Sequence, residues 1–235
     1  MGGQINTNST LGSSNFDGSI QSTVKVNASA GFSIIKYTGT GSSNVTVGHG
    51  LGVKPDLIII KSRGATGHWD VHAFGTIRFS LNLTEANQNN NQIQFANTTF
   101  TIPDTNANRN GNGVNYIAYC LSSVAGYSKF GTYDGNNAND GTFVFTGFRP
   151  AWVMIKRYDS ARDWLIYDNK RSTFNVIDDF LEPNNPNVEQ SASANSVDFV
   201  SNGFKFRNNS GDMNGAGDYV FLAFAEAPFK NARAR

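Results

Sequence analysis

Three histidines, one cysteine and several acidic residues are the side chains that could support metal binding or catalysis. His68 and His72 would share a strand face roughly 13 Å apart, too far for one metal ion. His49 could approach them only through the fold. Cys120 lies in an apolar run with no base nearby, so we expect a small buried side chain rather than a nucleophile. These residues predict no metal site, no catalytic site and no cofactor.

The acidic residues offer two further patterns. Asp104 to Asn108 begins like a calcium-binding loop, but Arg109 stands where that loop requires glycine, so a polar turn is favoured. Clustered acids in the second half could form a carboxylate pair of the glycosidase type, which leaves a polysaccharide depolymerase as the weakest of three functional hypotheses. These acids are Asp163, Asp168, Asp178 and Asp179.

Two tripeptides combine an aromatic ring with charged and hydrogen-bonding groups, as sugar-binding surfaces do. They are His68-Trp69-Asp70 and Arg162-Asp163-Trp164. The two tryptophans fall at equivalent places in an internal repeat, which favours a shared packing role over ligand contact. The candidate ligand-binding residues are nevertheless His68, Trp69, Asp70, Arg162, Asp163 and Trp164.

The internal repeat determines which elements position these side chains. Gly31-Phe32-Ser33 aligns with Gly126-Tyr127-Ser128, 95 residues later, and fixed-offset matches of Gly, Pro and Trp are rare by chance. At this offset Gly52 falls on Gly147, Pro55 on Pro150, Trp69 on Trp164 and His49 on Val144. Phe100 aligns with Phe204 at 104, so the second copy carries about nine extra residues, within 171–196, where Pro and Asn predict a surface loop. This loop is a further candidate contact site.

Each copy reads as six or seven short strands separated by glycine turns. The sequence predicts an all-β fold of two tandem antiparallel β-sandwich-like repeats packed by pseudo-twofold symmetry. One larger assembly sharing a sheet between copies is the alternative. The expected organisation is an irregular polar arm over 1–30, repeats over 31–125 and 126–230, and a basic tail over 231–235. The predicted strands are 32–37, 44–48, 56–61, 68–74, 93–96, 100–102 and 115–121, then 127–133, 142–145, 151–156, 164–167, 197–200, 204–207 and 218–224.

The composition argues against several classes of partner. The formal net charge is +1 with both signs interspersed, which predicts no nucleic-acid binding. No apolar run reaches the length of about 18 residues that a membrane span needs, and the N-terminus lacks the features of a signal peptide. We therefore expect a soluble chain without membrane insertion or an export signal of its own.

Several motifs resemble one known family. Thr146-Gly147-Phe148-Arg149-Pro150, Ser201-Asn202-Gly203-Phe204-Lys205 and Ala223-Phe224-Ala225-Glu226-Ala227 are similar to a domain of unknown function that recurs in structural proteins of marine tailed bacteriophages. The first copy shows the matching Val47 to Gly52, and the resemblance extends from Gly31 to Lys230. It implies a tail fibre, appendage or capsid-surface role and supplies no catalytic residues.

The sequence and the resemblance together favour a non-enzymatic bacteriophage virion protein that contributes to host attachment. The expected partners are other virion proteins and further copies of the chain, in a homo-oligomer such as a trimer, with host surface glycans as possible ligands. The expected location is the virion. A carbohydrate-binding module that recognises host glycans is the alternative.

Overall fold

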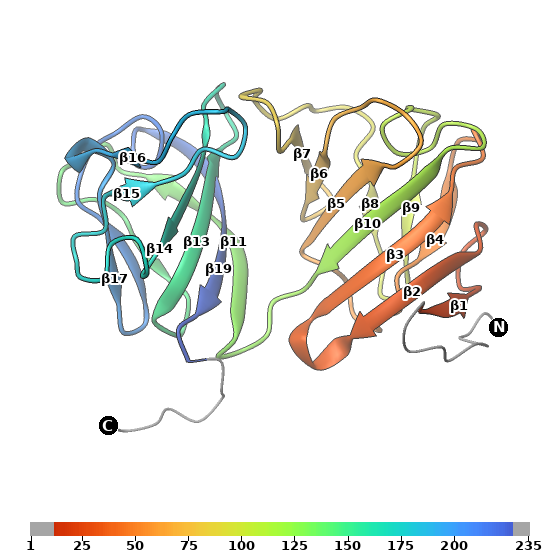
Figure 1. Ribbon diagram of the computed structural model, residues 1–235, viewed down its shortest axis with the longest axis horizontal. Coiled ribbons are helices and arrows are strands. Elements are labelled where there is room, and N and C mark those ends of the chain that lie inside the picture. The colour runs from red at the N-terminus through yellow and green to blue at the C-terminus, as the bar shows by residue number, and fades with distance from the viewer. Residues whose placement is uncertain (1–11, 228–235) are drawn as a thin grey trace. The chain divides into compact units, whose positions relative to one another are not determined.

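The computed structural model describes residues 12–227, which form an all-β fold with antiparallel sheets. The chain divides into two compact units. Within the described residues, the first unit comprises 12–81 and 88–122, and the second comprises 82–87 and 123–227. Each unit is described separately, with the elements labelled in Figure 1. The predicted basic tail and the first eleven residues of the predicted arm lie outside the described residues.

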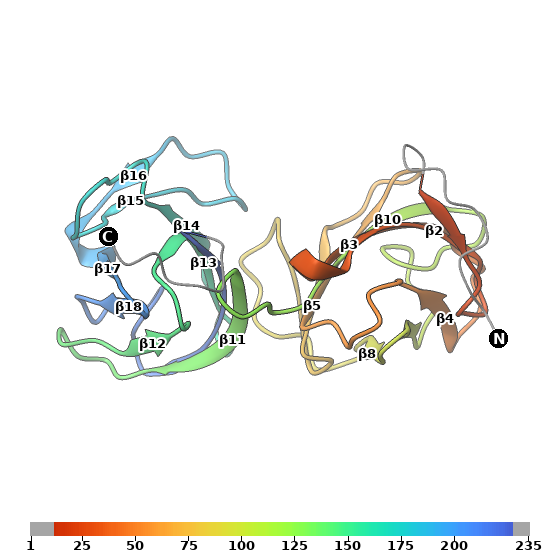
Figure 2. The same cartoon turned by 90° about the horizontal axis from the view of Figure 1, so that it is seen from below.

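The first unit contains a seven-stranded sheet in the order β1-β2-β3-β10-β5-β6-β7 and a three-stranded sheet in the order β4-β9-β8. Figure 2 shows β2, β3 and β10 on one side of this unit and β4 and β8 on the other. The strands are β1 (Ser13–Asn15), β2 (Ser22–Asn27), β3 (Phe32–Thr38), β4 (Val45–Gly48), β5 (Leu57–Ser62), β6 (Asp70–Ala73), β7 (Ile77–Ser80), β8 (Gln94–Phe95), β9 (Thr99–Ile102) and β10 (Asn115–Leu121), with a 3-10 turn at Ala28–Ala30.

The second unit contains a four-stranded sheet, β11-β19-β13-β14, a three-stranded sheet, β12-β18-β17, and a hairpin of β15 and β16. In Figure 2, β13 and β14 lie across the unit from β12, β17 and β18. The strands are β11 (Ser128–Gly135), β12 (Phe143–Phe145), β13 (Pro150–Arg157), β14 (Trp164–Asp168), β15 (Asp179–Phe180), β16 (Gln190–Ser191), β17 (Val197–Val200), β18 (Gly203–Phe206) and β19 (Gly217–Ala225), with a 3-10 turn at Ser193–Asn195.

Each unit has its own apolar core, to which both of its main sheets contribute alternate residues. In the first unit the large sheet supplies residues such as Ile35, Ile60 and Cys120, and the small sheet supplies Val47 and Phe100. In the second unit the contributing residues include Val153, Tyr167 and Phe221 from one sheet and Val144, Phe199 and Phe204 from the other.

The two units use the same strand order. The central part of the first large sheet, β3-β10-β5-β6, has the chain connections of β11-β19-β13-β14, and β4-β9-β8 has those of β12-β18-β17. The strands predicted from the sequence repeat lie at these positions, with ends that differ by two residues or fewer in the elements common to both units. Those strand predictions are confirmed.

Two expectations about local structure were wrong, and one strand was missed. The described part of the predicted irregular arm instead forms β1 and β2, which extend the large sheet, and its Ile20 and Val24 belong to the core. The alternation of Val24 and Val26 with polar residues is a strand pattern that the surrounding Ser, Thr and Asn obscured. Strand β7 was not predicted, and the insertion contains the β15–β16 hairpin rather than loop alone.

A buried asparagine and two stacked tyrosines recur at one end of each unit. Tyr37 and Tyr116 stack with ring centroids 5.2 Å apart, and Tyr133 and Tyr219 stack at 4.9 Å. The hydroxyl of Tyr37 donates to the Arg109 carbonyl, and that of Tyr133 to the Met213 carbonyl, both at 2.7 Å. The next residue along the chain is in each case a fully buried asparagine, Asn110 or Asn214.

These asparagines satisfy the backbone of the surrounding loops. The Asn214 amide nitrogen contacts the carbonyl oxygens of Ala138 (2.9 Å) and Asn208 (2.7 Å), and its oxygen accepts from the Thr142 N–H (3.1 Å). Asn110 likewise donates to the Ser42 carbonyl (2.7 Å) and accepts from the Thr40 N–H (2.9 Å). One side chain thus cross-links two loops in each unit, residues 136–142 to 208–214 in the second unit and residues 40–42 to the loop of Asn110 in the first.

We predict that Asn214→Ala lowers the free energy of unfolding by about 2–4 kcal/mol, because it leaves buried carbonyl and amide groups without partners. Urea unfolding followed by fluorescence measures the loss. Asn139→Ala is the matched control, since Asn139 lies in the loop between β11 and β12 to which the Asn214 amide donates but is itself exposed, and should change stability by less than about 0.5 kcal/mol. Equal effects of the two substitutions would contradict the cross-linking role.

Candidate functional site

The first candidate tripeptide does not form one exposed surface. His68 is exposed and Trp69 is 37% exposed, but Asp70 is only 1% exposed. Asp70 begins β6 and pairs with Ile60 of β5, on the inward face of the sheet. The expectation that Asp70 contributes to a surface ligand site was therefore wrong, because its carboxylate is used inside the unit.

The carboxylate of Asp70 is the centre of a buried charge network. Its Oδ2 accepts from Arg109 Nη1 at 2.6 Å and from His72 Nε2 at 3.1 Å, and its Oδ1 accepts from Arg78 Nε at 3.0 Å. Arg109 is fully buried and also pairs with Asp104. Burial alone would raise the pKa of Asp70, but the His72 hydrogen bond and the nearby positive groups hold that pKa well below its usual range.

The second unit fills the same positions without charge. Met213 takes the place of Arg109, before the buried asparagine, and Leu165 takes the place of Asp70, opposite the equivalent isoleucine of the neighbouring strand. Tyr167 stands where His72 does, and its hydroxyl lies 3.8 Å from the Met213 sulfur. The charge network is therefore a feature of one unit only.

Two of the three histidines are structural. His72 Nδ1 accepts from the Ile93 N–H (3.3 Å), and burial lowers the pKa of His72. His49 Nδ1 accepts from the Leu51 N–H (3.2 Å) while its Nε2 donates to the Ala96 carbonyl (3.1 Å), and burial lowers the pKa of this residue too. In each ring the Nδ1 atom that accepts a backbone N–H cannot also carry a proton, so this hydrogen bond favours the neutral form.

The register of the small sheets corrects the alignment of His49 with Val144. Val47 pairs with Phe100, and Val144 pairs with Phe204, so Val144 is the counterpart of Val47. The counterpart of His49 is Thr146, whose hydroxyl accepts from the N–H two residues ahead (3.4 Å), as His49 Nδ1 does. His49 thus closes a turn that a threonine closes in the other unit.

The structure also shows the surroundings of Cys120 and of the calcium-like stretch 104–108. Cys120 is fully buried, which confirms the predicted small core side chain, and burial raises the pKa of its thiol. The Asp104 carboxylate accepts hydrogen bonds from Arg109 and forms an ion pair with it. Within 12–227, no group of three or more His, Cys, Asp and Glu side chains is arranged to hold a metal ion.

The second candidate tripeptide lies where the insertion meets the sheet. Trp164 begins β14 and is fully buried, so its ring cannot stack on a ligand. The Asn184 side-chain oxygen accepts from the backbone N–H of Trp164 (2.8 Å), and the Asn184 amide nitrogen donates to the Asp163 carboxylate (2.6 Å). Leu181 and Ile166 exchange backbone hydrogen bonds at 3.1 and 2.9 Å, which fixes the insertion along β14.

Further amides and carboxylates extend this contact. Glu182 Oε2 accepts from the amide nitrogens of Asn185 (2.5 Å) and Asn187 (2.9 Å), and Arg162 Nε lies 3.6 Å from Asp212 Oδ1. Burial, with the charges of Asp163 and Glu182, raises the pKa of Asp212. We name this group the acid–amide cluster; it comprises Arg162, Asp163, Glu182, Asn184, Asn185, Asn187 and Asp212.

The chemistry of the acid–amide cluster is that of hydrogen-bonded recognition. The exposed guanidinium of Arg162, the exposed amide of Asn187 and the partly exposed carboxylate of Glu182 offer donors and an acceptor to a polyhydroxylated ligand. Of the other three acids considered for a catalytic pair, Asp168 binds Arg171 and Asp179 accepts from the Ser172 hydroxyl (2.9 Å), while Asp178 is half-buried.

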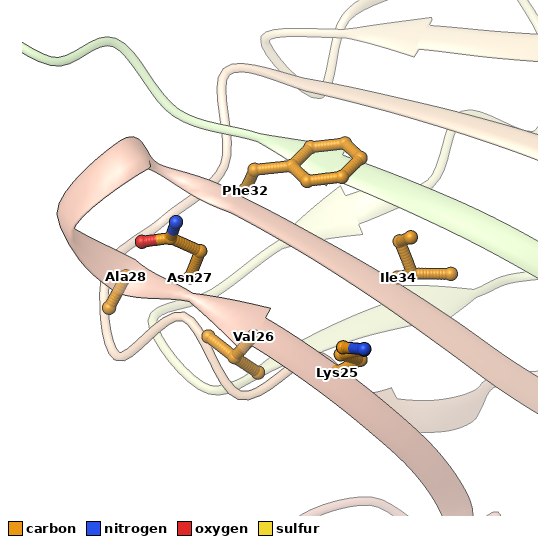
Figure 3. A pocket seen from close by; sticks show the side chains of 6 residues that line it. All are labelled: Lys25, Val26, Asn27, Ala28, Phe32 and Ile34. Atoms are coloured by element: carbon orange, nitrogen blue, oxygen red, sulfur yellow. The ribbon is translucent and has the colours of Figure 1, made fainter. Parts of the chain in front are cut away.

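A shallow hollow of about 510 Å³ lies on the outward face of β2 and β3 (Figure 3). Phe32 and Ile34 line it from β3, and Lys25 and Val26 from β2, with Asn27 and Ala28 at the turn. Phe32 also stacks on Tyr119, with centroids 6.4 Å apart. Its lining holds one charged group and no acid or histidine, so it offers mainly apolar contact.

The fold and the site define an all-β protein with two structurally similar units and a polar surface cluster. The chain belongs to the family described as a domain of unknown function, DUF7483, whose model matches residues 6–228, including both units. Comparison with curated proteins and with solved structures found no match. No helix in the described part of the chain is long and apolar enough to span a membrane.

Sequence reasoning found Arg162 and Asp163 but missed most of their partners. Glu182 to Asn187 was identified only as a surface loop within a candidate insertion, and Asp212 was not considered. The usable signal was the insertion itself, rich in Asn and present in one copy only. Asp212 had no such signal, because it reaches Arg162 only through the fold.

We predict that Arg109→Met lowers the free energy of unfolding by about 3–5 kcal/mol, because Asp70 then keeps a buried charge with fewer partners. Asp70→Leu combined with Arg109→Met reproduces the residues of the second unit and should be less destabilising than the sum of the single changes. Urea unfolding of the single and double variants measures the coupling. Met213→Leu in the second unit is the control and should cost less than about 1.5 kcal/mol. Additive effects of the two substitutions on the free energy of unfolding would show that Asp70 and Arg109 do not stabilise the fold as a coupled pair.

Proposed function

We propose that this chain is a non-enzymatic structural protein of a bacteriophage particle, a tail fibre, appendage or capsid-surface component that contributes to host attachment. The observation that carries the proposal is the agreement in strand order between the two units, combined with the family resemblance of their glycine, proline and aromatic motifs. Repetition of one rigid β module suits a protein that must hold its shape outside the cell.

The internal polar chemistry supports a scaffold role. In residues 12–227, all but two of the buried side-chain nitrogen and oxygen atoms have a hydrogen-bond partner. The Asp70 carboxylate, the His72 ring and the Asn214 amide are each used by neighbouring protein groups. Groups committed in this way rigidify a fold and leave few polar atoms for catalysis.

We also propose that the units are tandem copies of a β-sandwich-like module, packed by pseudo-twofold symmetry. Each large sheet has apolar residues on the face away from its core: Ile59 beside Tyr119 in one unit, and Met154 beside Leu222 in the other. Equivalent apolar faces favour burial against each other. The connection between β10 and β11, residues 122–127, is short, which is compatible with such packing.

The virion proposal predicts that antibodies against the purified chain label a fixed position on intact phage particles in electron micrographs. Sedimentation velocity should show a homo-oligomer at micromolar concentration. Antibodies adsorbed with the purified chain are the control for specific labelling. A monomer combined with unlabelled particles would contradict the proposal.

Carbohydrate recognition at the acid–amide cluster is the second candidate function, favoured by the exposed hydrogen-bonding groups that the insertion brings to Arg162. We predict that the chain binds host surface glycans on an array and that Arg162→Ala and Asn187→Ala each weaken binding at least tenfold. His68→Ala, at an exposed residue of the first unit, should leave binding unchanged. The absence of glycan binding on the array, or an equal loss of binding in all three variants, would exclude this cluster as the binding site.

A further inference from the structure

Strands β4 and β12 hold the same place in the two small sheets. Each is an edge strand: β4 pairs with β9 on one side, and β12 pairs with β18 on one side. Residue by residue, Thr46, Val47 and Gly48 correspond to Phe143, Val144 and Phe145. The environments on the outer side of these two strands differ.

In the first unit, the segment Gly18–Ser22 covers the outer edge of β4. The Ile20 N–H donates to the Thr46 carbonyl (2.9 Å), and Ile20 forms a parallel bridge with Val47. The Thr46 N–H donates to the Ser19 hydroxyl (2.9 Å), and the Ser22 hydroxyl donates to the Gly48 carbonyl (2.9 Å). A short extended segment thus satisfies the outward-facing backbone groups of β4.

The outer edge of β12 has its backbone groups directed outwards. The Phe206 N–H donates to the Thr142 carbonyl, and the Thr146 N–H donates to the Asn202 carbonyl. Because hydrogen-bonded pairs alternate along an antiparallel ladder, Val144 bonds to β18, whereas the N–H and C=O groups of Phe143 and Phe145 point away from it. No segment among residues 12–227 pairs with this side of β12.

The side chains of β12 add an apolar surface to that edge. Phe143 is 43% exposed and Phe145 is 63% exposed, whereas Val144 between them is in the core. Gly203 lies under Phe143, since a Cβ on Gly203 would come within 3.0 Å of the phenyl ring. Exposed edges of this kind usually carry charges or are covered, because they are templates for pairing with another strand.

We propose that β12 is a docking site for an extended segment of a partner protein, which adds as a parallel strand beside Phe143 and Phe145. The chemistry of the occupant follows from the equivalent edge in the first unit: a serine or threonine followed by a β-branched aliphatic residue, as in Ser19-Ile20. The hydroxyl residue would face Phe143 N–H, and the next backbone N–H would donate to the Phe143 carbonyl. Within residues 12–227 the segment with this chemistry, Gly18–Ser22, is already used at β4, and the proposal commits to a segment of another protein as the occupant. The proposal is independent of the phage assignment.

The experiment uses the full chain, labelled with ¹⁵N, and a capped synthetic peptide with the sequence of residues 17–22. We expect the peptide to shift the amide signals of Phe143 and Phe145 and to slow their hydrogen exchange. A peptide with N-methylated isoleucine, which lacks the donating N–H, and one with isoleucine replaced by aspartate should bind at least tenfold more weakly. The unmodified chain serves for all three peptides, so loss of folding cannot explain the differences.

Three results would overturn the proposal. The first is the absence of any change at Phe143 and Phe145 at saturating peptide concentration. The second is equal binding of the N-methylated peptide, which would show that no strand is added. The third is protection of these amides that grows with protein concentration without peptide, which would identify a second copy of this chain as the occupant.

Discussion

The loop ends of both units depend on a single constraint, which is that buried backbone groups must find partners where no strand supplies them. In each unit one fully buried asparagine, Asn110 or Asn214, provides both a donor and an acceptor to loops that are distant in the sequence. The stacked tyrosine pair beside it donates to the carbonyl just before that asparagine. With these groups in place, the large and small sheets of a unit can close around one apolar core.

That common frame explains why the units differ as much as they do elsewhere. The position before the asparagine supports a guanidinium in one unit and a thioether in the other, provided that the facing residue changes with it. Arg109 requires Asp70, whereas Met213 lies among Leu165 and Tyr167. An ion pair in a core costs desolvation that an apolar pair does not, so the network is better explained by local geometry than by stability. It also holds the loop that contains Asn91 and Ile93.

The sequence predicted what depends on local periodicity and on the repeat. The alternating runs at Phe32 and at Asn115 became β3 and β10, and the fixed offset placed their counterparts in the second unit. Prediction from the sequence failed where the partner of a residue is distant along the chain. Asp70 looked like a surface residue because its partner Arg109 lies 39 positions further on. Asp163 meets Asn184 across 21 positions, through an insertion whose path no local pattern specifies.

The same constraint applies to the edge strands at the surface of each unit. A unit must satisfy the outward backbone groups of its edge strands as well as its buried ones, and the first unit does so with residues that precede β2. In residues 12–227 such a segment lies beside β4, and none pairs with the equivalent edge at β12. The side chains at the two positions differ: Thr46 is hydrogen-bonded to Ser19 of the covering segment, and Phe143 is exposed at the open edge. A threonine hydroxyl suits pairing with Ser19, whereas an exposed phenyl ring gains only if apolar surface is placed against it. Thr46 and Phe143 therefore differ as the proposal expects of an edge that is closed by its own chain and an equivalent edge that accepts a partner strand.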